Sequence, residues 1–154
     1  MPATNTSCST VFHRYIIFFC PAMLNFHING EEPAIVGEVC QGFCLIQHQE
    51  GDAITDQANM ALFKFAGSWF KLHFDGETIF WRATEKPSEP VNDRLSTCLV
   101  LLNLCEFEGV VDSTLKDIEY GGDEEAVWVK LHFSSGKTLL FKHHAYDDYT
   151  TINC

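Results

Sequence analysis

A six-residue segment that occurs twice constrains how this chain of 154 residues can fold. Residues 69–74 read W-F-K-L-H-F, and residues 128–133, which begin 59 positions later, read W-V-K-L-H-F. In both copies the apolar residues recur with period two, which is typical of a β-strand with one buried face. A turn sequence, a G-x-T triplet and a second apolar run follow each copy. Both copies therefore predict the first strand of a β-hairpin.

The first predicted hairpin turns at Asp75-Gly76. This dipeptide is preferred in a two-residue type I′ turn, because both central residues need a positive φ. Such a turn fixes the register and places Trp69 opposite Arg82 on the outer face of the hairpin.

The second predicted hairpin has a three-residue loop, residues 134–136, in which Gly136 takes the left-handed conformation that such loops need. This register places Trp128 opposite Lys142, so that a tryptophan again faces a cation. Shared turn chemistry alone could make two hairpins alike, but the repeated outward-facing residues favour a duplication.

Further apolar runs at 62–65 and 115–120 precede the two hairpins, and a fainter third copy of the pattern lies at 26–31, with an Asn-Gly turn. The sequence therefore predicts a mainly β fold: a single-domain antiparallel sandwich or barrel built from two related β-meanders. The internal repeat covers about 40–83 and 98–142.

Residues 94–105 leave the secondary structure open. The run is apolar nearly all round, has few β-branched residues, and follows Asn92 and Asp93, which could cap a helix. A central strand and a buried helix both fit this pattern. An α+β fold with a helix at about 94–105 is therefore the alternative to the all-β fold.

Residues 1–22 differ from the rest of the chain. They lack the basic start and the long uninterrupted apolar core of a signal peptide, and their apolar run, broken by His13 and Arg14, is too short to span a membrane. We interpret 1–22 as an N-terminal extension, with Met23 as the alternative start of translation. Residues 23–154 then form the single β domain.

The reactive side chains do not form a recognisable catalytic or metal-binding pattern. The seven cysteines are odd in number and accompany no export signal, so we expect free thiols in a reducing cytoplasm. Neither the cysteines nor the seven histidines have the spacing of a zinc site. No glycine-rich phosphate loop or G-x-S-x-G motif is present. From the sequence we therefore expect a protein that binds no cofactor and no metal ion and has no enzymatic activity.

Charge is the second informative feature. The chain has 21 acidic and 10 basic residues, a formal net charge of −11, which disfavours nucleic acid and anionic membranes as partners.

The negative charge is concentrated in one segment. Between residues 106 and 125 there are eight carboxylates and one cation. Solubility alone would account for negative charge, but its concentration in one segment favours a surface that binds a basic protein. Nearby aromatic side chains would supply the anchors of such a surface. The predicted partner-binding residues are Asp117, Glu119, Tyr120, Asp123, Glu124, Glu125, Trp128, Tyr146, Asp147 and Asp148.

In character, the chain resembles the bacterial immunity proteins of contact-dependent or polymorphic toxin systems. The resemblance lies in its small size, its cytosolic composition, its acidic surface and the lack of catalytic motifs. The resemblance implies that the chain inhibits a cognate toxin, such as a nuclease, by binding it stoichiometrically and blocking the basic face with which the toxin binds its substrate.

The alternative is a small-molecule-binding β module without catalysis. In that case Phe70, Phe74, Trp81 and Phe141 would line an apolar cavity between the two meanders. Ordinary core packing is the competing interpretation of these four aromatic residues.

Overall fold

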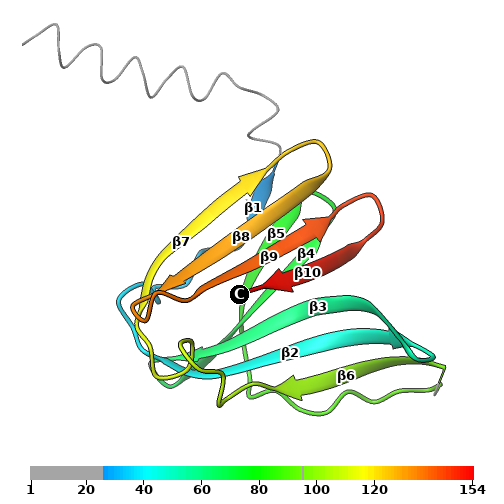
Figure 1. The fold of residues 1–154 in the computed structure, drawn as a ribbon, viewed down its shortest axis with the longest axis horizontal. Coiled ribbons are helices and arrows are strands. Elements are labelled where there is room, and N and C mark those ends of the chain that lie inside the picture. Colours follow the sequence, from blue (N-terminus) through cyan, green and yellow to red (C-terminus); the bar gives the residue numbers. More distant parts are fainter. Residues whose placement is uncertain (1–25, 95) are drawn as a thin grey trace, which may run out of the picture.

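The structure is a computed structural model that describes residues 26–94 and 96–154 (Figure 1). This part of the chain forms strands and no helix. The interpretation of residues 1–22 lies outside the described residues. The strands are β1 (His27–Asn29), β2 (Cys40–Glu50), β3 (Ala53–Phe65), β4 (Ser68–Asp75), β5 (Thr78–Thr84), β6 (Thr97–Asn103), β7 (Leu115–Gly122), β8 (Ala126–Phe133), β9 (Thr138–His144) and β10 (Tyr149–Asn153).

The strands form two sheets that pack together as a sandwich, which confirms the predicted fold class (Figure 1). The larger sheet has the order β1-β5-β4-β3-β2-β6, and the smaller has the order β10-β9-β8-β7. The barrel alternative is wrong, because the sheets do not close on each other. Each sheet contains one predicted meander, β3-β4-β5 in the larger and β7-β8-β9 in the smaller.

The second hairpin has the predicted register. Trp128 lies opposite Lys142 and Leu131 opposite Leu139. Gly136 has a φ of 91°, and its N–H donates a hydrogen bond of 3.0 Å to the carbonyl oxygen of Phe133. A positive φ costs glycine little, and it closes the three-residue loop between β8 and β9.

The register predicted for the first hairpin is wrong by two residues. Asp75 remains in the strand and pairs with Thr78, so Trp69 lies opposite Thr84 instead of Arg82. Only Gly76, with a φ of 57°, takes the left-handed conformation in this turn. Glycine in the first loop position is typical of a two-residue II′ turn, whereas the predicted I′ turn also needs a positive φ at Asp75. A shift of two residues keeps each side chain on its face of the sheet, and the sandwich is therefore unaffected.

The described part of the ambiguous segment 94–105 contains strand β6, and the helix alternative is wrong. β6 pairs with β2 at the edge of the larger sheet. Asn92 does not cap a helix: its side chain accepts a hydrogen bond of 2.8 Å from the N–H of Leu99 and donates one of 2.9 Å to the Leu99 carbonyl. This amide thus pairs with the outward-facing N–H and carbonyl groups of Leu99, at the edge of the sheet where β6 has no neighbouring strand in the described part of the chain.

The third, fainter copy of the hairpin pattern does not form a hairpin. The strand β1 pairs with β5 in a parallel orientation, with Ile28 opposite Ile79. Gly30 has a positive φ of 89°, but the mostly exposed residues 31–34 that follow it form no strand, and β1 has β5 as its neighbour in the sheet.

The core lies between the inner faces of the two sheets. Phe43 stacks on Phe63 with ring centroids 4.8 Å apart, and Phe141 of the smaller sheet meets Phe63 edge to face at 6.1 Å. Trp81 and Phe141 are fully buried, and Phe70 and Phe74 pack against the same cluster. The four aromatic residues of the ligand-binding alternative are therefore part of the packed interior.

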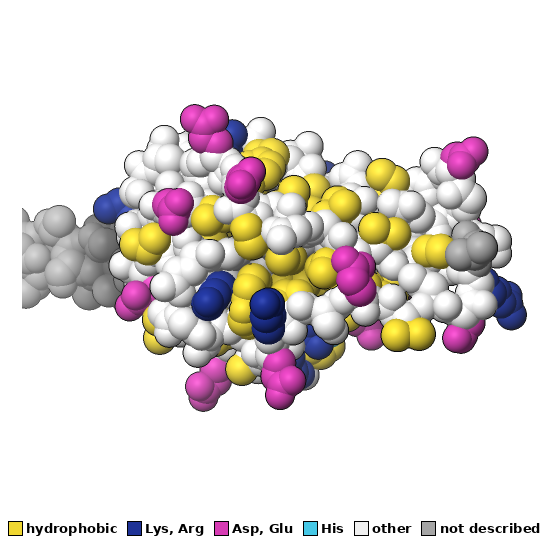
Figure 2. Space-filling model, turned by 90° about the horizontal axis from the view of Figure 1, so that it is seen from below, with side chains coloured by type: hydrophobic (Ala, Val, Ile, Leu, Met, Phe, Trp, Pro, Cys, Tyr) yellow, Lys and Arg dark blue, Asp and Glu magenta, His cyan; other side chains and the backbone are white. Residues whose placement is uncertain are grey.

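The outer face of the larger sheet carries a second, smaller apolar cluster. Cys44, Ile46 and Leu62 are buried there under partly exposed side chains that include Trp69 and Leu101. Figure 2, a view from the side on which β6, β2 and β3 lie, shows hydrophobic side chains across this face, with acidic side chains mostly toward its margin.

Side chains of β3 join the two sheets at the edge of β10. The Asp56 carboxylate accepts a hydrogen bond of 2.9 Å from the backbone N–H of Thr150, and the Gln57 side chain accepts one of 3.1 Å from the N–H of Ile152. Two backbone N–H groups at the outer edge of β10 thereby find acceptors in the neighbouring sheet. This junction places the turn between β9 and β10 beside β3.

Candidate functional site

The ten predicted partner-binding residues lie in three different environments. Three of them, Asp117, Glu119 and Trp128, are on the outer face of the smaller sheet. Tyr120 points into the sandwich. The remaining six are in two turns, at residues 123–125 and 146–148. Only the turns bring predicted residues from distant parts of the sequence together.

On the outer face of the smaller sheet, opposite charges lie side by side. The Nε2 atom of His132 is 3.1 Å from a carboxylate oxygen of Glu119, which lies across from Lys130 in the β7–β8 pair. The ammonium group of Lys130 in turn lies 4.9 Å from the ring centroid of Trp128. This face is therefore a mixed-charge surface rather than an acidic one.

Tyr120 is part of a hydrogen-bonded chain at the margin of the core. The indole N–H of Trp81 donates to the Tyr120 hydroxyl at 2.9 Å, and that hydroxyl donates to the Glu32 carboxylate. Burial, together with the hydrogen bond to Glu32, raises the pKa of Tyr120. The structure thus uses Tyr120 to join β7 to β5 and to the segment after β1, and its hydroxyl is already engaged within the chain.

The turns after β7 and β9 meet around a shallow cleft of about 340 Å³, which we call the turn cleft. Tyr146 stands at its rim with 97% of its surface exposed. A stack of His144 on Tyr149, with centroids 4.4 Å apart, holds the histidine beside it. The residues that line the turn cleft are Glu124, Glu125, His144, Tyr146 and Asp147.

Asp123, at the start of the same turn, has a structural role. One oxygen of its carboxylate accepts hydrogen bonds from the backbone N–H groups of Glu125, at 2.8 Å, and Ala126, at 2.9 Å. These bonds to Ala126 and Glu125 lower the pKa of Asp123, because they favour its charged form. Asp123 therefore holds the backbone of the turn, and Glu124 and Glu125 project from it.

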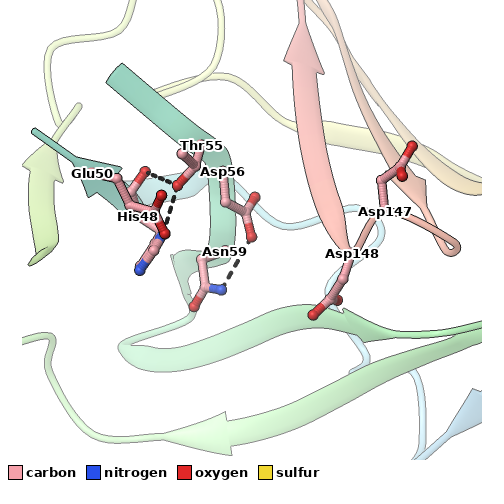
Figure 3. Close-up of a pocket in the computed structure, with 7 residues that line it drawn as sticks. All are labelled: His48, Glu50, Thr55, Asp56, Asn59, Asp147 and Asp148. Atoms are coloured by element: carbon pink, nitrogen blue, oxygen red, sulfur yellow. Dashed lines mark hydrogen bonds between the residues drawn. The ribbon is translucent and has the colours of Figure 1, made fainter. Parts of the chain in front are cut away.

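A second cleft, of about 450 Å³, adjoins the turn cleft and shares Asp147 with it. We call it the β3 cleft. Figure 3 shows Thr55, Asp56 and Asn59 on one side and Asp147 and Asp148 on the other. The residues that line the β3 cleft are His48, Glu50, Thr55, Asp56, Asn59, Asp147 and Asp148.

The wall formed by β2 and β3 is the part of the site that sequence reasoning missed. Asp56 is mostly buried, and its second oxygen accepts a hydrogen bond of 3.1 Å from the side chain of Asn59. On the neighbouring strand, the Nδ1 atom of His48 is 2.6 Å from the hydroxyl of Thr55. No linear pattern links these residues to Asp148, because the packing of the sheets alone brings them together.

The electrostatics of the two clefts favour cations. Glu50, Asp56, Asp147 and Asp148 line the β3 cleft, and two further glutamates line the turn cleft. None of the described residues that line either cleft is a lysine or an arginine. An ammonium or guanidinium group that entered would therefore find carboxylate partners without an internal competitor.

A buried histidine lies behind the β3 cleft. His143 on β9 has 2% of its surface exposed, and its Nε2 atom has no hydrogen-bond partner. The closest carboxylate oxygen across this gap belongs to Asp148, at 3.7 Å, which exceeds hydrogen-bonding distance. Burial lowers the pKa of His143, so the ring is neutral near pH 7.

Over residues 26–94 and 96–154, no group of three or more His, Cys, Asp or Glu side chains is arranged to hold a metal ion. The same residues contain no helix with the length and apolar character that a membrane crossing requires. Comparisons of the chain with protein-family models, with curated proteins and with solved structures give no match.

Proposed function

We propose that this protein binds a basic protein partner through the turn cleft and the β3 cleft. The observation that carries the proposal is the convergence of carboxylates from β2, β3 and two turns around adjoining clefts, which no lysine or arginine lines within the described part of the chain. The carboxylates repel one another in the unbound protein, which lowers its stability. A partner with a cationic surface reduces this repulsion when it binds.

The overall charge supports the same role. With a formal net charge of −11, the chain attracts a cationic partner from beyond contact distance, and the clefts set where that partner docks. Exposed Tyr146 lies at the rim of the turn cleft, where it can bury its ring against the partner. Tyrosine in this position supplies apolar contact area in a site that is otherwise charged.

We propose further that binding neutralises the partner, as in the bacterial immunity proteins that the chain resembles in character. A toxin that acts on nucleic acid holds its substrate with lysine and arginine side chains. An acidic protein that occupies those side chains excludes the substrate, and it needs no catalytic group of its own.

The proposal is tested by capturing the partner from the native organism with the tagged protein as bait, and by identifying the eluted proteins by mass spectrometry. The bait variant is the double charge reversal Glu124→Lys and Glu125→Lys, which spares Asp123 and therefore the turn. The matched control, Glu85→Lys and Glu89→Lys, makes the same change of charge in the exposed connection between β5 and β6.

We expect the wild-type and control baits to capture one basic protein and the cleft variant to lose it. The captured protein is then assayed for nuclease activity, which an equimolar amount of the wild-type chain should suppress. Capture that survives the reversal in the turn cleft would reject these clefts as the binding surface. Capture without suppression would reject neutralisation and leave binding in place.

A further inference from the structure

We propose that the β3 cleft is a subsite for one arginine side chain of the partner, and that protonation of His143 releases this arginine. The inference rests on the proposed function and adds to it the chemical class of the group that is bound and a control by pH.

The lining of the β3 cleft suits a planar cation with several N–H donors. Asp56 and Asn59 lie on one side of the cleft, and Asp147 and Asp148 lie on the other (Figure 3). Each Asp56 oxygen already accepts one hydrogen bond, from Thr150 or from Asn59, and keeps a lone pair for a second. A guanidinium group has five donors in a fixed plane and can bridge carboxylates on opposite walls, whereas an ammonium group is a point charge.

His143 is built into the wall behind this subsite. Its ring stacks on Phe74 with centroids 5.4 Å apart, and its Nδ1 atom is 2.9 Å from the hydroxyl of Thr150. The Nε2 atom lacks a partner and faces Asp148 at 3.7 Å. A buried polar nitrogen without a partner disfavours the fold unless another state of the protein uses it.

The charged groups around His143 come from four elements. Asp148 of the β9–β10 turn, Asp56 of β3 and Asp75 of β4 favour its protonated form, and the neighbouring His144 on β9 opposes it. Burial outweighs these contributions and keeps the ring neutral near pH 7.

On acidification the His143 ring takes up a second proton, so both of its nitrogens become donors, and the exposed carboxylate of Asp148 can reach the Nε2–H by a small movement. Asp148 has a left-handed backbone, with a φ of 54°, in a surface turn, and its side chain is 81% exposed, so it is free to rotate. The new ion pair withdraws one carboxylate from the cleft and adds a positive charge behind it. Arginine and the proton thus compete, and their coupling is reciprocal.

The experiment is an NMR titration of the full chain with N-acetyl-arginine methylamide. The citrulline counterpart, which has the same shape without the charge, is the control probe. The signals to follow are the Thr150 amide, which reports on Asp56, and the ring of His143. At about pH 7.5 we expect the arginine probe to shift both signals and the citrulline probe to shift neither. As the pH is lowered toward about 5, the affinity for arginine should fall, because the proton and arginine compete.

Three variants separate the parts of the proposal. Asp148→Asn, an exposed change that asparagine tolerates at positive φ, should abolish the response to arginine. His143→Gln should keep the binding of arginine and lose its pH dependence. His73 is another histidine whose pKa is lowered by burial, but it lies on the outer face of the larger sheet. His73→Gln should therefore change neither the binding of arginine nor its pH dependence.

Equal shifts from arginine and citrulline, or no shifts with arginine in the millimolar range, would overturn the subsite. A pH dependence that persists in His143→Gln, or that disappears in His73→Gln, would overturn the coupling. Neither result affects capture of a basic partner by the wild-type chain, so this proposal and the proposed function can fail separately.

Discussion

The sharpest structural prediction concerns Asp56, which both joins the two sheets and lines the β3 cleft. In Asp56→Ala the N–H of Thr150, a residue with 2% of its surface exposed, loses a charged acceptor at 2.9 Å. The loss of such a bond, with the donor left buried, costs about 2 to 3 kcal/mol. For a chain of this length, that corresponds to a fall in Tm of about 5 to 10 °C. Urea and thermal unfolding followed by circular dichroism measure both quantities.

The matched control is Asp147→Ala, which removes the same charge from the same cleft. Asp147 is exposed, and no hydrogen bond ties its carboxylate to the neighbouring sheet among the described residues. We expect its free energy of unfolding to stay within about 0.5 kcal/mol of the wild-type value. Equal losses in the two variants would refute the role of Asp56 as a tie between β3 and β10.

Three further predictions concern a turn, a glycine in strand β7 and the buried histidine. Ala66→Gly should raise the free energy of unfolding in urea by about 0.5 to 1 kcal/mol, because Ala66 has a φ of 49° in an exposed turn. Gly121→Ala should lower it by about 1 to 3 kcal/mol, because a Cβ atom at Gly121 would overlap the indole of Trp128. Burial lowers the pKa of His143 below its unfolded value of about 6.5, so stability should fall as the pH drops through that value, and His143→Gln should reduce this slope in pH-dependent unfolding. Stability that rises on acidification in this range would contradict the last prediction.

Much of the architecture could be predicted because it depends on local patterns. Alternation of apolar and polar residues is a direct consequence of the pleat, so both meanders were expected. The three-residue loop that ends in Gly136 fixes the register of its hairpin, and the predicted register is correct. Asp75-Gly76 is compatible with two turn types, which differ in whether Asp75 remains in the strand, and here the prediction failed.

The strand β6 shows the limit of periodicity. Its residues are half-buried on both faces, because one face meets the core and the other belongs to the apolar cluster on the outside of the larger sheet. Such a segment has no alternation to distinguish it from a buried helix. Its pairing with β2 makes the segment a strand, and this pairing joins residues about 50 positions apart, which a local pattern does not reveal.

The candidate site also contains one part that the sequence predicts and one part that it does not. The acidic turns were identified from the sequence because their carboxylates are consecutive. The wall formed by β3 was not, because Asp56 contacts Thr150 across 94 positions and resembles any other acidic residue in a strand. Tyr120 and Asp123 were expected to meet a partner, whereas the structure gives both of them internal hydrogen bonds. Sequence patterns reveal where charge is concentrated, but not which charges the fold itself uses.

The central claim is that the turn cleft and the β3 cleft dock a basic partner, and the association rate constant with the captured partner tests it most directly. We predict that this rate constant falls steeply between about 0.05 and 0.5 M salt, because screening shortens the range of attraction. At the lowest salt concentration, the reversal of Glu124 and Glu125 should slow association at least about tenfold, whereas the reversal of Glu85 and Glu89 should slow it much less. A rate constant that is independent of salt, or equal for the two reversals, would contradict the claim.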